Sequence, residues 1–363
     1  MQTVIVIPCL NEESLIAATA GSLGFGRGQS HTPPETSLIL VDNGSQDGTL
    51  TILEHIREQS RTGSVVVVAE AEQGYVPARH RGILAARDFA QAGHLSHDDV
   101  LILQADADTR YEPEYVEAMH ATALAAPPNA LIEGTIRPPS CFVRDHPGYQ
   151  RLADEVDASV APFFVDDGLD VIVDDKVSGF SLATYFAWGA HRREYTSQGA
   201  ELHAETARLF IRGKIRGAVR VRAGDAGALP SRRRILENPI RHFASAGFPR
   251  ESSWWPLWRA TYNGPLDLAA FEDTGSQAAL APAVLTRKAH LVALFGILPA
   301  VLERRLRGST SLEALHPFLR DILDAFPSAD LVDLDQSLAA LFERVFRLTD
   351  DSAEAFCRPL EQP

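Results

Sequence analysis

Short runs of apolar residues alternate with longer helical patterns along the chain up to residue 135. The apolar runs rich in Val, Ile and Leu cover residues 4–7, 37–41, 65–69 and 100–103. Segments with helical spacing lie between and after them, at residues 13–22, 49–59, 77–91 and 113–126. Strands that are buried on both faces read as continuous apolar runs, and strand–helix alternation indicates a parallel sheet. The pattern predicts an α/β fold with a doubly wound, mostly parallel nucleotide-binding sheet.

The pattern changes in the second half of the chain. It weakens between residues 137 and 170, where one helix is expected over Tyr149–Ala161, and mixed strands and helices return over residues 171–222. Beyond Ser231 the spacing of apolar residues is mostly helical. We therefore predict an α/β domain over residues 1–235, followed by a mostly helical C-terminal region, 236–363, whose role the sequence does not indicate.

Charge and cysteine content narrow the class of protein. A formal net charge of −14 argues against a nucleic-acid partner, because phosphate contacts need a basic surface. The three cysteines, Cys9, Cys141 and Cys357, lie far apart and have no metal-site spacing. Such sparse cysteines favour reduced thiols. The expected location is the cytoplasm, with peripheral contact at the inner face of the membrane as the alternative.

The apolar stretch Ala289–Leu302 is the longest in the second half, and it contains Pro299. It is shorter than the roughly 20 apolar residues that a membrane-spanning helix needs. We expect a buried helix there and no transmembrane segment. No signal peptide is visible at the start of the chain.

Polar residues follow the first two predicted strands. Pro8-Cys9-Leu10-Asn11-Glu12-Glu13 follows the first strand, and Asp42-Asn43-Gly44-Ser45-Gln46-Asp47-Gly48 ends the second. Ligands of open parallel sheets bind outside the carboxyl ends of the strands, and a carboxylate there can accept hydrogen bonds from a base or a ribose. Helix capping and a tight turn explain the same residues structurally.

An acidic pair, Asp106 and Asp108, follows the fourth predicted strand. Two carboxylates this close repel each other unless a cation lies between them, and Mg²⁺ is typically held by one or two carboxylates plus substrate phosphates. Before that strand, Gly74 is followed by Arg79 and Arg81 at the start of a predicted helix, a position that favours anions. The alternatives are an ordinary acidic turn and a solvated helix face.

These four segments, VIPCLNEE, LILVDNGSQDGT, GYVPARHRG and LILQADADT, occur in an order and at intervals that resemble the inverting glycosyltransferases of family two. The resemblance implies a GT-A fold and a nucleoside-diphosphate sugar as donor. It implies that Pro8 and Glu12 shape the base pocket and that Asp42 contacts the base or ribose. It also implies that Arg79 lies near the nucleotide, and that Asp106 and Asp108 hold Mg²⁺ or Mn²⁺ on the donor diphosphate.

The acceptor half of the family pattern is less complete. Glu205-Thr206 stands where the family carries a Glu-Asp pair that usually contains the catalytic base, so Thr206 departs from the pattern. Three alternatives remain: Glu205 is the base, Glu201 or His203 has taken the task, or activity is lost.

The expected function is therefore transfer of a sugar, with inversion and metal dependence, from a nucleoside-diphosphate sugar to a hydroxyl group. The acceptor is unknown: a saccharide, a small molecule or a lipid-linked acceptor all fit. The alternatives are a catalytically silent nucleotide-sugar-binding protein and a sugar-phosphate nucleotidyltransferase. The latter usually carries a Gly-rich basic loop where this chain has Pro8–Glu13.

Overall fold

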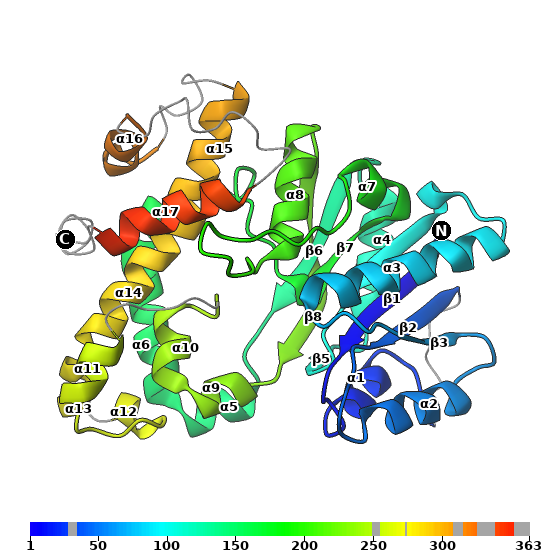
Figure 1. Cartoon of the computed structure of the whole chain (residues 1–363), viewed down its shortest axis with the longest axis horizontal. Helices are drawn as coiled ribbons and strands as arrows, with labels where there is room; N and C mark the ends of the chain where they lie inside the picture. The colour runs from blue at the N-terminus through cyan, green and yellow to red at the C-terminus, as the bar shows by residue number, and fades with distance from the viewer. Residues whose placement is uncertain (28–34, 249–254, 273, 308–314, 325–337, 352–363) are drawn as a thin grey trace. The chain divides into compact units, whose positions relative to one another are not determined.

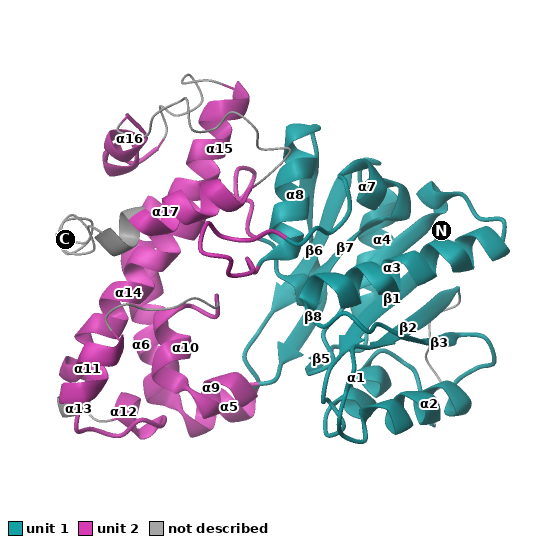
Figure 2. Ribbon diagram, in the orientation of Figure 1, with its two compact units in different colours: residues 1–139, 173–193, 204–231 teal, residues 140–172, 194–203, 232–363 magenta. Residues whose placement is uncertain are grey.

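A computed structural model of the chain describes residues 1–27, 35–248, 255–272, 274–307, 315–324 and 338–351. The chain divides into two compact units, each built from segments that are separate in the sequence (Figure 2). Unit 1 comprises residues 1–139, 173–193 and 204–231, and unit 2 comprises residues 140–172, 194–203 and 232–363.

Unit 1 contains an eight-stranded sheet with the order β3-β2-β1-β4-β7-β6-β8-β5 (Figure 1). Its strands are β1 (Gln2–Cys9), β2 (Thr36–Asp42), β3 (Val65–Ala69), β4 (Val100–Gln104), β5 (Thr109–Tyr111), β6 (Ala130–Ile136), β7 (Ser178–Ser181) and β8 (Val219–Pro230). Strands β3, β2, β1 and β4 are parallel, β7 is antiparallel to both of its neighbours, and β8 is parallel to β6. The four predicted strands and the mixed, mostly parallel α/β sheet are confirmed.

The helices of unit 1 are α1 (Ile16–Ser22), α2 (Thr49–Gln59), α3 (Tyr75–Ala92), α4 (Tyr115–Ala125), α7 (Leu182–Ala187) and α8 (Glu205–Ile215). Short 3₁₀ turns precede β4 (His97–Asp99) and β7 (Asp175–Val177). The first four helices match the predicted segments to within three residues at either end.

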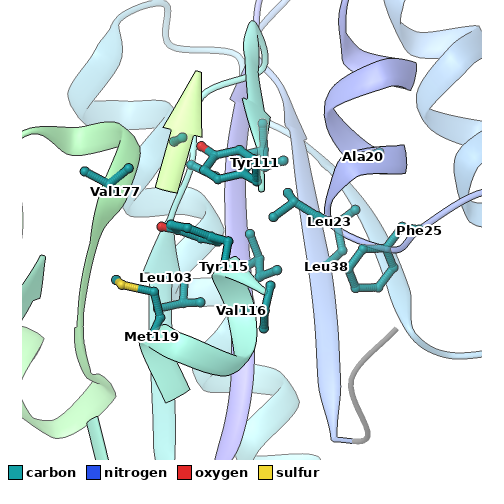
Figure 3. Packing of buried hydrophobic residues seen from close by; sticks show 14 of the residues in the cluster. Ala20, Leu23, Phe25, Leu38, Leu103, Tyr111, Tyr115, Val116, Met119 and Val177 are labelled. Atoms are coloured by element: carbon teal, nitrogen blue, oxygen red, sulfur yellow. The ribbon is translucent and has the colours of Figure 1, made fainter. Parts of the chain in front are cut away.

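Both faces of the central strands are covered, which explains their continuous apolar runs. Ile5 and Ile7 of β1 belong to a core cluster with residues of α1, α2 and α4, including Ala20, Leu23, Leu53 and Val116. Figure 3 shows part of this cluster, where the rings of Tyr111 and Tyr115 lie 4.5 Å apart. On the other face, Gly82 of α3 approaches Val6 so closely that an added Cβ would lie 2.3 Å from its Cγ1.

Unit 2 is helical in its described part. Its helices are α5 (Ser140–Asp145), α6 (Pro147–Val160), α9 (Arg233–Glu237), α10 (Pro239–Ala244), α11 (Trp255–Thr261), α12 (Ala269–Glu272), α13 (Thr274–Ala279), α14 (Ala281–Val292), α15 (Leu298–Arg307), α16 (Pro317–Asp324) and α17 (Ala339–Asp351). Aromatic contacts among Tyr149, Phe243 and Phe271 centre one of its cores. The predicted helix at Tyr149–Ala161 is confirmed as α6, whereas residues 249–254, 273, 308–314, 325–337 and 352–363 of the predicted helical region lie outside the described residues.

The apolar stretch Ala289–Leu302 is part of a longer helical run. A π-helical turn, Ala293–Ile297, joins α14 to α15, so the helix continues from Ala281 to Arg307 over 27 residues. By length and composition alone it passes for a membrane span, so the expectation that it is too short is wrong. In its most apolar window, 72% is buried inside the structure, as in the core helix of a folded protein. The expected burial is confirmed.

Candidate functional site

A buried arginine, Arg79, joins three carboxylates of unit 1. Its Nε donates a 2.9 Å hydrogen bond to Glu205 Oε1, and its Nη2 donates a 2.7 Å hydrogen bond to Asp106 Oδ1. The same Nη2 lies 3.6 Å from Asp175 Oδ2. We call Arg79, Asp106, Asp175 and Glu205 the Arg79 cluster. Two of the predicted candidates, Asp106 and Glu205, thus meet at a third, Arg79.

The charge balance of the cluster is reflected in two pKa values. Burial by itself would lower the pKa of Arg79, but the charges of Asp106, Asp175 and Glu205 outweigh it and raise that pKa above its ordinary value. Burial raises the pKa of Asp175 to about 8, and the negative charge of Glu205 adds to this against the opposing charge of Arg79. One cation is therefore shared among three acids, and the pKa of Asp175 lies above that of an ordinary aspartate.

The start of α3 places Arg79 in the cluster. Gly74, with φ 138°, precedes the helix in a conformation that side-chain-bearing residues rarely adopt. Its N–H donates to Asn43 Oδ1, and the Asn43 amide donates to the carbonyls of Glu70 and Glu72. The asparagine after β2 therefore holds the turn after β3, which fixes the helix that carries the arginine.

Asp106 lies in the turn between β4 and β5. Its backbone N–H donates to the hydroxyl of Tyr111, which donates in turn to the carbonyl of Lys176. The short antiparallel pairing of β5 with β8 closes this turn, and Ser231 N–H donates to the carbonyl of Asp108. The backbone of the acidic pair is thus held by a hydrogen bond that Asp106 N–H donates to a buried tyrosine and by one that the Asp108 carbonyl accepts.

Thr206, the departure from the expected Glu-Asp pair, is fully buried next to Glu205. Its hydroxyl accepts a 3.0 Å hydrogen bond from Gln104 Nε2, which also donates to Ser178. His191 Nε2 lies 3.4 Å from the same hydroxyl, and burial keeps the pKa of His191 well below its ordinary value, so that its ring is neutral. Thr206 also forms a side-chain hydrogen bond with Asp175, and it has no carboxylate of its own to offer.

The loops that follow β1 and β2 are tied to each other by hydrogen bonds. Asn11 N–H donates to Ser45 Oγ, and Asn11 Oδ1 accepts from Gln46 N–H at 2.8 Å. Glu12 N–H donates to Thr49 Oγ1, and Glu13 Oε2 accepts from Gly48 N–H at 2.6 Å. Asp42, the last residue of β2, is buried and accepts from Ser45 N–H.

The predicted base-pocket residues also share one neighbourhood. Pro8 pairs with Val41 at the end of β1, next to Cys9 and Asp42. Burial raises the pKa of Cys9, and the charges of Glu12, Asp42 and Asp106 raise it further. Three acids from three different strand ends therefore act on the pKa of one buried thiol.

The residues present fit a divalent cation by their chemistry. Asp106 and Asp108 supply carboxylate oxygens, the ligands that Mg²⁺ and Mn²⁺ accept, at the end of a buried strand. Among the described residues, no group of three or more His, Cys, Asp or Glu side chains is arranged to hold a metal. A pair without a third protein ligand suits an ion that completes its shell with substrate phosphates and water.

Two other sequence candidates lie elsewhere in the chain. Glu201 forms an isolated bridge with Tyr195 in unit 2, and His203 belongs to the same unit. Their candidacy as the base stays a prediction. Asp175 was not among the residues predicted from the sequence, because it follows no predicted strand and belongs to no recognised motif. The acidic pair Asp174-Asp175 is the signal that the sequence offers for it.

A protein-family comparison gives the family of the N-terminal half of the chain. The model described as "Glycosyl transferase family 2" matches residues 4–180. An uncharacterized glycosyltransferase of Mycobacterium tuberculosis and one of Mycobacterium bovis are each 37% identical to this chain over 82 residues. The match covers 23% of this chain and 30% of each relative. The chain is thus aligned with less than a third of these relatives' own length.

Solved structures resemble the chain at low identity. A mannosyltransferase from Pyrobaculum calidifontis, solved with GDP-Man and Mn²⁺, is 13% identical with a TM-score of 0.47, and the match covers 100% of this chain and 88% of that one. S. aureus TarS 1–349, solved with UDP-GlcNAc, is 13% identical with a TM-score of 0.44, and the match covers 98% and 92%. Glucosyl-3-phosphoglycerate synthase from Mycobacterium tuberculosis is 16% identical with a TM-score of 0.40, and the match covers 68% and 75%.

Proposed function

The chain belongs to glycosyl transferase family 2 through residues 4–180, and on this premise we propose that it transfers a sugar from a nucleoside-diphosphate donor to a hydroxyl acceptor. The observation that carries the proposal is the Arg79 cluster. It brings Arg79, Asp106 and Glu205 together beside the carboxyl ends of β1, β2 and β4, where ligands of such sheets bind.

On the nucleotide side, the proposal gives the base pocket to Pro8 and Glu12 and the base or ribose contact to Asp42. The hydrogen bonds between the two loops support this assignment, because they hold Glu12 and Asp42 in place before a ligand arrives. Such preorganisation lowers the entropy that binding must overcome.

On the diphosphate side, Asp106 and Asp108 would hold Mg²⁺ or Mn²⁺, which when bound neutralises charge on the donor diphosphate and on the leaving group. Arg79 acts on the same region. Its Nη1 is buried and has no hydrogen-bond partner in the described part of the chain. A buried donor left unpaired is unfavourable by about 1–3 kcal/mol, so an anionic ligand at Nη1 would gain that energy back.

On the acceptor side, a carboxylate removes the proton of the attacking hydroxyl, and attack opposite the leaving diphosphate inverts the anomeric carbon. Glu205 and Glu201 are the candidates from the sequence. General-base catalysis contributes about 10²–10⁴-fold, so loss of the base leaves weak but measurable transfer.

The test starts with a thermal-shift screen of UDP-, GDP- and dTDP-sugars with and without Mn²⁺, followed by measurement of nucleoside diphosphate release. We expect one donor class to stabilise the protein only with the metal, and to be turned over. The Asp106→Ala/Asp108→Ala protein should lose both responses. Asp98→Ala is the matched control, because Asp98 lies in the exposed turn at the opposite end of the same strand. Wild-type turnover by the double variant would refute the metal assignment.

A second function remains supported by Thr206, which puts no carboxylate where the family pattern has one. In that case the chain binds a nucleotide sugar without transferring it. Metal-dependent stabilisation by a donor, with no release of nucleoside diphosphate in the presence of varied saccharide acceptors, would favour this binding function.

A further inference from the structure

Three carboxylates surround Arg79, and we propose that Asp175 is the one that accepts the proton of the acceptor hydroxyl. This inference rests on the proposed function and deepens it, since it names a catalytic residue that sequence analysis did not consider. Glu205 is then a positioning residue that orients Arg79.

The side chains of the three acids differ in how far they are exposed to solvent. A base must be reached by its substrate, but the Glu205 side chain is only 4% exposed and the Arg79 side chain that covers it is 4% exposed. The side chains of Asp106 and Asp175 are 27% and 20% exposed. Asp106 belongs to the predicted metal pair, so Asp175 is the acid of the cluster that a hydroxyl can approach.

Hydrogen bonding to Arg79 also distinguishes Asp175 from the other two acids. Glu205 Oε1 and Asp106 Oδ1 each accept a hydrogen bond from the guanidinium, at 2.9 and 2.7 Å. Asp175 Oδ2 lies 3.6 Å from Nη2, beyond hydrogen-bond distance, so the two groups attract each other without sharing a proton. Asp175 accepts a hydrogen bond from the Thr206 side chain, whereas its Oδ1, which is buried, has no hydrogen-bond partner in the described part of the chain. One oxygen of the Asp175 carboxyl group therefore keeps acceptor capacity for a ligand.

The backbone around Asp175 is fixed without using its carboxyl group. Asp174 Oδ1 accepts from Lys176 N–H and pairs with Lys176 Nζ, both at 2.9–3.0 Å. Asp174 N–H donates to the buried Glu133, and Val177 N–H donates to the Asp174 carbonyl. Asp174 thus shapes the turn and Asp175 is held in position by its neighbours, as expected for a group that acts on a substrate.

The step balances as follows. The acceptor O–H bond breaks and its proton passes to the Asp175 carboxylate, while the acceptor oxygen forms a bond to the anomeric carbon. The bond from that carbon to the diphosphate oxygen breaks, and its electron pair leaves with the nucleoside diphosphate. Burial raises the pKa of Asp175 to about 8, so the ionised form that accepts the proton increases as the pH rises toward that value.

The experiment compares Asp175→Asn, Glu205→Gln and the control Asp98→Asn, whose side chain lies in the exposed turn before β4. For each protein, kcat is measured with the donor that the wild type turns over. The dissociation constants of Mn²⁺ and of the nucleoside diphosphate are measured by calorimetry. We expect Asp175→Asn to lower kcat by about 10²–10⁴-fold and to leave both dissociation constants within about threefold, since one neutral hydrogen bond changes binding by little more.

We also expect near-wild-type kcat for Asp98→Asn. Glu205→Gln should keep at least about a tenth of the wild-type kcat, because glutamine still accepts from Arg79 Nε. Retention of more than a tenth of kcat by Asp175→Asn would overturn the assignment. So would a hundredfold loss in Glu205→Gln with nucleotide binding intact, which would identify Glu205 as the base. A wild-type protein that binds nucleotide but releases no product with any donor would instead overturn the proposed function itself.

Discussion

Arg79 Nε and Glu205 Oε1 form a 2.9 Å hydrogen bond between residues 126 positions apart in the chain, and both side chains are 4% exposed. The pair connects α3, which packs against β1 and β2, to the first residue of α8. Because Asp106 and Asp175 share the same guanidinium, removal of the arginine leaves three acids without their common counter-charge.

Arg79→Met should therefore destabilise the protein strongly. Breaking a buried ion pair by removing one partner typically lowers the free energy of unfolding by about 3–5 kcal/mol. Urea unfolding at pH 8 measures the change. Arg87→Met is the matched control on the same helix, because the side chain of Arg87 is 37% exposed and its ion pair is with the exposed Asp88. Its effect should stay below about 1 kcal/mol, and equal losses in the two variants would contradict the cluster.

The raised pKa of Asp175 predicts a dependence of stability on pH. In the folded chain Asp175 holds its proton up to about pH 8, whereas in the unfolded chain it ionises near pH 4. Between these values the folded state binds more protons, so the stability contributed by Asp175 is present below about pH 4 and lost as the pH rises through about 8. Asparagine cannot ionise, so the Asp175→Asn protein does not lose stability at this position as the pH rises.

The free energy of unfolding of Asp175→Asn, relative to the wild type, should consequently increase from about pH 5 to about pH 9. Urea titrations in the presence of EDTA measure this difference without metal at Asp106. A constant difference across that range would show that Asp175 ionises in the folded protein as it does in the unfolded one.

Gly82→Ala should destabilise the packing of α3 against the sheet. An added Cβ would lie 2.3 Å from Val6 Cγ1 and 3.0 Å from Val41 Cγ2, so helix or strands must move. Overpacking typically lowers the free energy of unfolding by about 1–3 kcal/mol, which exceeds the helix-propensity gain of about 1 kcal/mol. Gly93→Ala is the comparison, because its Cβ would make only contacts of 3.5 Å or longer. Thermal unfolding would show the difference, and a stabilised Gly82→Ala would refute the close approach.

Asn11→Gly should weaken donor binding without slowing the chemical step. Asn11 has φ 55°, which glycine adopts freely, so the substitution removes mainly the hydrogen bond from Gln46 N–H to Oδ1. This hydrogen bond contributes about 1 kcal/mol to the free energy that holds the loop in position. Its loss corresponds to a rise of about fivefold in the KM for the donor. Steady-state kinetics should show this rise with kcat nearly unchanged. A fall in kcat at constant KM would place Asn11 in the chemistry rather than in the pocket.

The sequence by itself determined the α/β sheet, because strands buried on two faces need continuous apolar runs and these are visible as β1, β2, β3 and β4. It also determined that Asp42, Arg79 and Asp106 belong to one region, since residues that follow parallel strands meet at one edge of a sheet. These inferences depend on local periodicity and on the rule of the parallel sheet, both of which can be read from consecutive residues.

Only the tertiary structure decided which acids share Arg79. Glu205 belongs to α8, a helix far along the chain from Arg79. Asp175 belongs to a 3₁₀ turn, which no periodic pattern in the sequence predicts. Burial and charge at such a site arise from segments brought together by folding. The pKa of Asp175 and the hydrogen bond of Glu205 with Arg79 therefore depend on the folded cluster, and neither can be predicted from a single segment of the sequence.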